Sequence, residues 1–221
     1  MEQCIRETWG SVIHPSVKIW FYYGDSDNFE IQDNNIFCPY DEGYVNIGRK
    51  TICAFEYLLT TDFDYIFRPN SSSYVNIDKL YEFTQTLPTS LVYSGSSIPY
   101  DTVGECCSGC GFFLSRDLVE MIVRNKEKWN HSLIDDIALC ELLFELNVKM
   151  VSSPRLKILN AINGELYGLE GLIKDIDLLD AFHITSRGKE NVPVPDNYRE
   201  INCNIMKTLH SKYMSIKPEY R

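Results

Sequence analysis

The stretch Tyr65-Ile66-Phe67-Arg68-Pro69-Asn70-Ser71-Ser72-Ser73 decides the fold prediction, because a strand signal and a loop signal stand side by side in it. Its first three residues are apolar and β-prone, which predicts a buried strand, and the proline and serines that follow end it. Ligands of open α/β sheets usually bind at the carboxyl ends of strands. Arg68, Asn70, Ser71 and Ser72 are therefore candidate ligand-binding residues, although a turn with a solvated arginine explains them equally well.

Strand and helix signals alternate on both sides of this stretch. Runs of β-prone residues predict further strands over residues 17–23, 36–38, 91–93 and 148–151. Apolar residues recur at helical spacing in four segments, which predicts helices over residues 44–59, 77–84, 116–128 and 198–213. Ser115 is the expected N-cap of the third helix, and Ser132 with Asp135 predicts a capping box at the start of one more. Residues 164–180 fit a helix or a loop.

This alternation predicts an α/β fold, a three-layer sandwich with a mainly parallel central sheet. With 221 residues, of which 44% are hydrophobic, the chain is expected to form one domain over residues 1–221.

The net charge of −10 argues against nucleic acid as a partner, because an acidic surface repels a phosphate backbone. No apolar run reaches the roughly 20 residues that span a bilayer, and the start lacks a secretion signal. We therefore expect a soluble protein without a membrane segment.

The sequence holds 8 cysteines, most of them within apolar runs. A reduced cysteine in such a run behaves as a small hydrophobic residue, so mainly reduced thiols are expected. Cys107 and Cys110 have C-x-x-C spacing, but no second ligand pair for zinc is evident.

Two neighbouring carboxylates, Asp135 and Asp136, open the helix after residue 134. A helix N-terminus holds a carboxylate rigidly, which is what a general base requires. Capping explains Asp135 better than catalysis does, whereas Asp136 is the better candidate for the base. Ser108 and Gly109 begin a glycine-containing segment whose backbone can approach a ligand closely. His183, followed by Arg187, is a candidate for contact with phosphate or metal, although a lone histidine is more often structural.

Several segments, in this order, resemble the β-1,3-galactosyltransferase and fringe family of GT-A glycosyltransferases. They are Ile5-Arg6-Glu7-Thr8-Trp9-Gly10, Tyr44-Val45-Asn46-Ile47 with Lys50-Thr51, residues 108–119 (SGCGFFLSRDLV) and Ile134-Asp135-Asp136-Ile137. Tyr65 to Ser72 occupies the place of that family's strand and triple-aspartate motif. The matches span residues 5 to about 140.

The resemblance implies an inverting enzyme that moves a monosaccharide from a UDP-sugar to a glycan hydroxyl. Asp136 would be the catalytic base, with Asp135 beside it. The donor would be held by Lys50, Arg68, Asn70, Ser71, Ser72, Ser108, Gly109, His183 and Arg187. Because Asn70-Ser71-Ser72 replaces three aspartates, a requirement for Mn²⁺ or Mg²⁺ is left open. Only four residues precede Ile5, where the family usually has a strand. Residues 189–221 would form a C-terminal helical tail.

The altered motif is similar to sugar transferases of bacteria and of large DNA viruses, including those of algae, in which glycosylation can be cytoplasmic. A cytoplasmic protein, in the host cytoplasm if viral, is therefore expected. Two other readings stay open: a non-catalytic carbohydrate-binding or scaffold protein that retains the fold, and a nucleotide-sugar hydrolase.

Overall fold

The computed structural model describes residues 1–159, 180–187 and 196–216, and its chain divides into two compact units. The first unit contains Met1–Val17, Pro69–Thr86 and Pro154–Arg221, and the second unit contains Lys18–Arg68 and Leu87–Ser153. The expectation of one domain over residues 1–221 stays a prediction.

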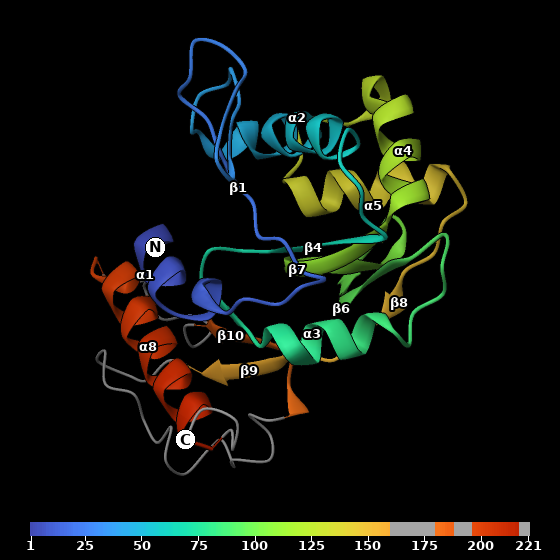
Figure 1. The fold of residues 1–221 in the computed structure, drawn as a ribbon. Helices are drawn as coiled ribbons and strands as arrows, with labels where there is room; N and C mark the ends of the chain where they lie inside the picture. The colour runs from blue at the N-terminus through green and yellow to red at the C-terminus, as the bar shows by residue number, and fades with distance from the viewer. Residues whose placement is uncertain (160–179, 188–195, 217–221) are drawn as a thin grey trace. The chain divides into compact units, whose positions relative to one another are not determined.

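The second unit contains two sheets, and the larger one has the strand order β4-β7-β6-β8. Its strands are β4 (Tyr65–Pro69), β6 (Tyr93–Tyr100), β7 (Gly104–Ser115) and β8 (Val151–Ser152). β6 runs antiparallel to β7 and parallel to β8. Figure 1 shows α2 (Ile47–Leu58), α4 (Arg116–Arg124) and α5 (Asp135–Glu145) on the same side of this sheet. Two short 3-10 helices, η2 (Tyr44–Asn46) and η3 (Lys126–Lys128), precede α2 and follow α4.

The core of the second unit forms where β7 packs against α4 and α5. Phe112 and Leu114 of β7, Leu118 and Ile122 of α4, and Leu139 of α5 are each at most 1% exposed. Full burial of such a side chain contributes on the order of 1.5–3 kcal/mol relative to exposure. The start of α5 is thereby held against the strand that carries Gly109.

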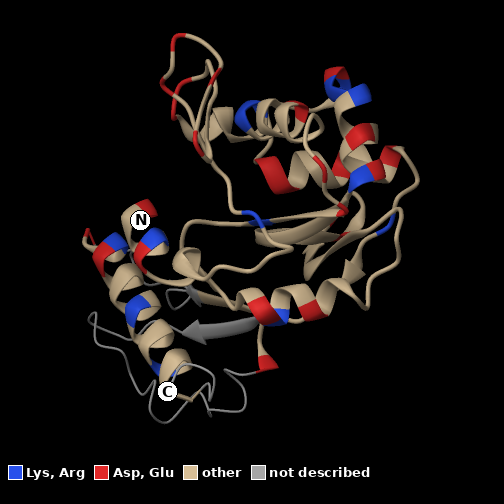
Figure 2. Ribbon diagram, in the orientation of Figure 1, with Lys and Arg blue, Asp and Glu red and all other residues tan. Residues whose placement is uncertain are grey.

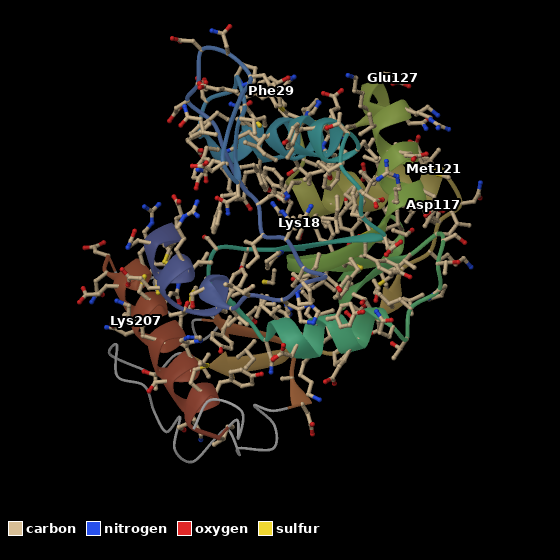
Figure 3. The ribbon with its side chains drawn as sticks, viewed as in Figure 1. Lys18, Phe29, Asp117, Met121, Glu127 and Lys207 are labelled. Carbon is tan, nitrogen blue, oxygen red and sulfur yellow. A yellow bond between two sulfur atoms is a disulfide. The ribbon has the colours of Figure 1, made fainter. Side chains whose placement is uncertain are left out.

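A second, smaller sheet of the same unit has the order β1-β3-β2. Its strands are β1 (Phe21–Tyr23), β2 (Glu30–Gln32) and β3 (Asn35–Phe37). β3 is parallel to β1 and antiparallel to β2. Acidic residues are prominent in the loops of this region, as Figure 2 shows, and Phe29 is labelled there in Figure 3.

The first unit has a three-stranded sheet of order β5-β10-β9. Its elements are α1 (Glu2–Glu7), η1 (Trp9–Ser11), β5 (Ser73–Val75), α3 (Ile77–Thr84), β9 (Leu156–Leu159), β10 (His183–Arg187) and α8 (Tyr198–Ile216). β10 is antiparallel to β5 and parallel to β9. Lys207 of α8, labelled in Figure 3, places its ammonium 3.3 Å from the Glu7 carboxylate, which joins α8 to α1.

The α/β class is confirmed, and the five expected helices are present. All three sheets contain antiparallel pairs, so a mainly parallel central sheet is not confirmed. The stretch from Gly104 to Ser115 forms the long strand β7, which the sequence did not predict, because its glycines have weak β-propensity and the pairing with β6 supplies the stability. Of residues 164–180, all but Asp180 lie outside the described part of the chain.

Two capping predictions are wrong. Ser115 is at the N-cap position of α4 but makes no capping hydrogen bond, since its hydroxyl donates to Asp117 and accepts from the Val92 N–H. Ser132 does not cap α5, because the N-cap position is Ile134. The prediction of mainly reduced cysteines holds for six of them, whereas Cys106 and Cys140 form a disulfide, because the fold brings residues 34 apart in sequence into contact. Among the described residues, none of the helices has the length and apolar character needed to cross a bilayer.

Candidate functional site

The predicted site residues divide between the two units. Lys50, Arg68, Ser108, Gly109, Asp135 and Asp136 belong to the second unit, and Asn70, Ser71, Ser72, His183 and Arg187 belong to the first. Within the second unit, the structure gathers Arg68, Gly109, Asp135 and Asp136 into one cluster.

Arg68, near the carboxyl end of β4, is the cationic member of this cluster. Its Nη2 lies 2.6 Å from Asp135 Oδ2, a close ion pair whose angles fall outside those of a regular hydrogen bond. Its Nη1 donates to the Gly109 carbonyl at 3.2 Å, and its Nε donates to the Tyr22 hydroxyl at 3.0 Å. The guanidinium also lies 5.6 Å from the centre of the Phe112 ring, within the range of a cation–π contact. Two hydrogen bonds, an ion pair and an aromatic face therefore fix this side chain.

Tyr22 is a member of this cluster that the sequence did not identify. Its hydroxyl lies 3.2 Å from the Thr51 hydroxyl as well as 3.0 Å from Arg68 Nε. The phenol thus joins β1 and α2 to the guanidinium. No signal in the sequence reveals it, because Tyr22 is 46 positions from Arg68 and lies in a run of aromatic residues that reads as a plain strand.

Asp136 is the buried carboxylate of the cluster, with 8% of its surface exposed. It is the second residue of α5, whose acidic first turn is red in Figure 2. Its Oδ2 accepts the Gly109 N–H at 2.6 Å, and its Oδ1 accepts the Ile137 N–H at 3.0 Å. Two backbone donors therefore hold a carboxylate that has little contact with water.

Gly109 is required at its position by the approach of Asp136. A Cβ at Gly109 would lie 2.8 Å from Asp136 Oδ2 and 3.0 Å from its Cγ, distances that a real Cβ does not tolerate. The backbone of Gly109 donates to Asp136 and accepts from Arg68. One peptide segment of β7 therefore sets the positions of both charged side chains.

The electrostatics of the cluster favour a basic carboxylate beside a permanent cation. Burial raises the pKa of Asp136, and the neighbouring charge of Asp135 raises it further, against the lowering effect of the Gly109 N–H, the Ile137 N–H and Arg68. Burial acts to lower the pKa of Arg68, but Tyr22 and Asp135 outweigh it, so the guanidinium stays charged. An aspartate with a raised pKa binds a proton more strongly than an exposed one does, which suits a general base.

Lys50 and Ser108 take part in other interactions of the second unit. The buried ammonium of Lys50 forms an ion pair with Glu42, whose other carboxylate oxygen accepts the Gly24 N–H. Lys50 therefore joins α2 to the segments that follow β1 and β3. Ser108 is buried, and its Oγ accepts the Cys110 N–H at 3.4 Å.

The candidates of the first unit surround the start of β5. Asn70 Oδ1 accepts hydrogen bonds from the Ser72 hydroxyl at 3.1 Å and the Ser73 hydroxyl at 2.7 Å. His183 is 2% exposed, and its Nε2 lies 2.9 Å from Ser73 Oγ. Ser71 is exposed. Arg187 is the last residue of β10, and its side chain lies outside the described part of the structure.

The segment Asn70-Ser71-Ser72 does not suit a divalent cation of the kind that carboxylates hold. Its donors are neutral, and the Asn70 oxygen already accepts two hydroxyl groups. Mg²⁺ and Mn²⁺ prefer sites with carboxylate ligands. Within residues 1–159, 180–187 and 196–216, no three His, Cys, Asp or Glu side chains gather closely enough to hold a metal ion. Metal dependence stays an open prediction.

A comparison of the sequence with models of known protein families gives no match, and a search of curated proteins gives no relative.

Proposed function

We propose that the chain is an inverting glycosyltransferase of GT-A type that moves a monosaccharide from a UDP-sugar to a glycan hydroxyl. The observation that carries the proposal is the buried Asp136 carboxylate, held by the Gly109 N–H beside the Arg68–Asp135 ion pair. The mixed α/β sheets are compatible with this fold class. The segments that resemble the β-1,3-galactosyltransferase and fringe family supply Gly109, Asp135 and Asp136 in that order along the chain.

Asp136 would act as the general base. Its carboxylate takes the proton of the acceptor hydroxyl while the hydroxyl oxygen attacks the anomeric carbon, and the bond from that carbon to the diphosphate breaks with release of UDP. Attack from the face opposite the leaving group inverts the anomeric configuration. The raised pKa of Asp136 makes it a better proton acceptor than an exposed aspartate, and the Gly109 N–H fixes one of its oxygens.

Arg68 would interact with the negative charge that develops on the departing diphosphate. A guanidinium carries five N–H donors; the hydrogen bonds to Tyr22 and Gly109 occupy one on Nε and one on Nη1, and the Asp135 carboxylate lies beside Nη2. The remaining donors suit phosphate oxygens, which guanidinium groups bind well. Ser108 and Gly109 would add backbone that approaches the sugar. The donor-binding roles expected for Lys50, Asn70, Ser71, Ser72, His183 and Arg187 stay predictions from sequence.

The competing function is a non-catalytic carbohydrate-binding or scaffold protein. The Arg68–Asp135 ion pair fits this alternative as well, because a buried ion pair can be purely structural. The raised pKa of Asp136 favours the enzyme, since a structural carboxylate gains nothing from it, although perturbed carboxylates also occur in structural networks.

Asp136→Asn tests the proposal, because it keeps the shape of the side chain and removes the base. Loss of a positioned general base costs on the order of 10² to 10⁴ in rate. We expect UDP release in the presence of acceptor to fall by that factor across a panel of UDP-sugars, while calorimetry shows unchanged donor binding. Asp117→Asn, at the start of α4, is the matched control and should retain activity. Normal turnover by the Asp136 variant would refute the assignment of the base.

A further inference from the structure

The disulfide between Cys106 and Cys140 joins the same two elements that meet at the candidate base. Cys106 lies on β7 and Cys140 lies on α5, and both are buried, with 0% and 3% of their surface exposed. This bond is the only covalent link between side chains in the part of the chain that the structure describes. It has no role in the proton transfer described above.

The sequence spacing places the disulfide one helical turn from Asp136. Cys140 follows Asp136 by four residues, so the two side chains lie on the same face of α5, about 6 Å apart along the helix axis. Gly109 follows Cys106 by three residues along β7. The disulfide and the Gly109–Asp136 hydrogen bond are therefore neighbouring links between one strand and one helix face.

Apolar side chains pack around the disulfide. Ile137 packs with Cys106 and Cys140, and Ile98 and Leu133 pack against that cluster. Asp136 itself has little freedom, since an added Cβ at Gly109 would lie only 2.8 Å from it. A shift of α5 along or away from β7 by less than an ångström would therefore change the hydrogen bond that orients the carboxylate.

We propose that the Cys106–Cys140 disulfide is a positioning element for Asp136, which fixes the first turn of α5 against Gly109 of β7. Reduction breaks the S–S bond: a dithiol such as dithiothreitol supplies two electrons and two protons, leaves two thiols on the protein and becomes its own cyclic disulfide. The Gly109–Asp136 hydrogen bond then opens more often. The consequence for catalysis rests on the proposed function, but the consequence for the hydrogen bond does not.

The first measurement is a thiol count by alkylation and mass spectrometry. Denatured protein without reductant is expected to label at the six cysteines outside the disulfide, with Cys106 and Cys140 labelled only after reduction. Labelling of Cys106 and Cys140 without reductant, in protein purified under oxidising conditions, would overturn the proposal.

The second measurement is hydrogen exchange of the Gly109 amide by NMR, in oxidised protein, in protein reduced in place, and in Cys140→Ala. We expect exchange to be about tenfold faster or more without the disulfide, which corresponds to about 1.4 kcal/mol in local opening. Amides of β1 and β3 should be unchanged, and Cys203→Ser in the first unit is the matched cysteine control. Reduction of the folded wild type keeps the test valid if the alanine variant does not fold. An unchanged Gly109 amide would contradict the proposal.

Transfer kinetics then separate this proposal from the proposed function. If both hold, reduction lowers kcat with little change in the donor KM. If exchange at Gly109 is faster in the reduced protein but the protein never transfers sugar, the positioning role is supported and the glycosyltransferase proposal is wrong. If sugar transfer is equally fast in oxidised and reduced protein, the enzyme proposal is supported and the positioning role is wrong.

Discussion

Gly109→Ala is the substitution that most directly perturbs the geometry of the candidate base. The new Cβ would lie 2.8 Å from Asp136 Oδ2, whereas ordinary van der Waals contact begins at 3.4 Å. The carboxylate must therefore move by about 0.6 Å, the difference between those distances, or β7 must move instead. Because Asp136 is buried and α5 packs against the core, we expect the carboxylate to move and its 2.6 Å hydrogen bond to the Gly109 N–H to weaken.

A misplacement near 1 Å at a reacting group can cost about 100-fold in rate. We therefore expect Gly109→Ala to lower kcat for sugar transfer about 10- to 100-fold and to leave the donor dissociation constant within about twofold. The assay is UDP release with donor and acceptor, together with calorimetric titration of the donor. Overpacking should also lower the unfolding free energy by about 1–3 kcal/mol, so circular dichroism must show that the variant is folded under assay conditions.

Gly43→Ala is the matched control for this experiment. A Cβ at Gly43 would meet nothing closer than 3.9 Å, so the same chemical change introduces no contact with a charged group. This variant should turn over like the wild type. If Gly109→Ala also keeps the wild-type kcat, the argument that the Gly109 backbone positions Asp136 is wrong.

Three further predictions concern stability. The pKa of Asp136 is raised above its ordinary value of 3.8, so the folded protein holds that proton more tightly than the unfolded chain, and stability falls as the pH rises from 3.8 through the raised pKa. The melting temperature of Asp136→Asn, compared with that of the wild type, should therefore be relatively higher at neutral pH than at acid pH. A difference between the two proteins that does not change with pH would contradict this. Gly48→Ala would place a Cβ 2.6 Å from the Trp129 indole nitrogen, so urea unfolding should show a loss of about 1–3 kcal/mol, against none expected for Gly43→Ala. Burial lowers the pKa of His210, whose Nδ1 lies 3.3 Å from the Tyr74 hydroxyl, so stability should be lost as the pH falls below 6.5, and His210→Gln should flatten that dependence in denaturation curves.

The helices were predictable because their apolar periodicity is local. α2 is an example: the spacing of Ile52 and Phe55 indicates a buried helix face, and both are buried in the structure. The strand β7 was not predictable in the same way. Its glycines are disfavoured in strands, and its stability comes from antiparallel pairing with β6 and from Phe112 and Leu114 in the core.

The candidate site shows the same division between local and long-range information. The start of a helix predicted two fixed carboxylates at Asp135 and Asp136, and the structure has them there. The sequence could not predict that Arg68, 67 positions before Asp135, forms an ion pair with it, because an ion pair between distant segments leaves no pattern in the sequence. The hydrogen-bond partner of His183 and the disulfide of Cys106 could not be predicted for the same reason, since each depends on which strands and helices pack together.

Calorimetric titration of the wild-type protein with UDP and a panel of UDP-sugars, with and without Mn²⁺, tests the central claim most directly. A nucleotide-sugar transferase must bind its donor, and Arg68→Ala should weaken that binding, because it removes a cation that we expect to contact the diphosphate. We predict saturable binding of UDP and of at least one UDP-sugar. Absence of binding to every nucleotide, by a folded protein with and without the metal, would contradict the enzyme and favour the scaffold.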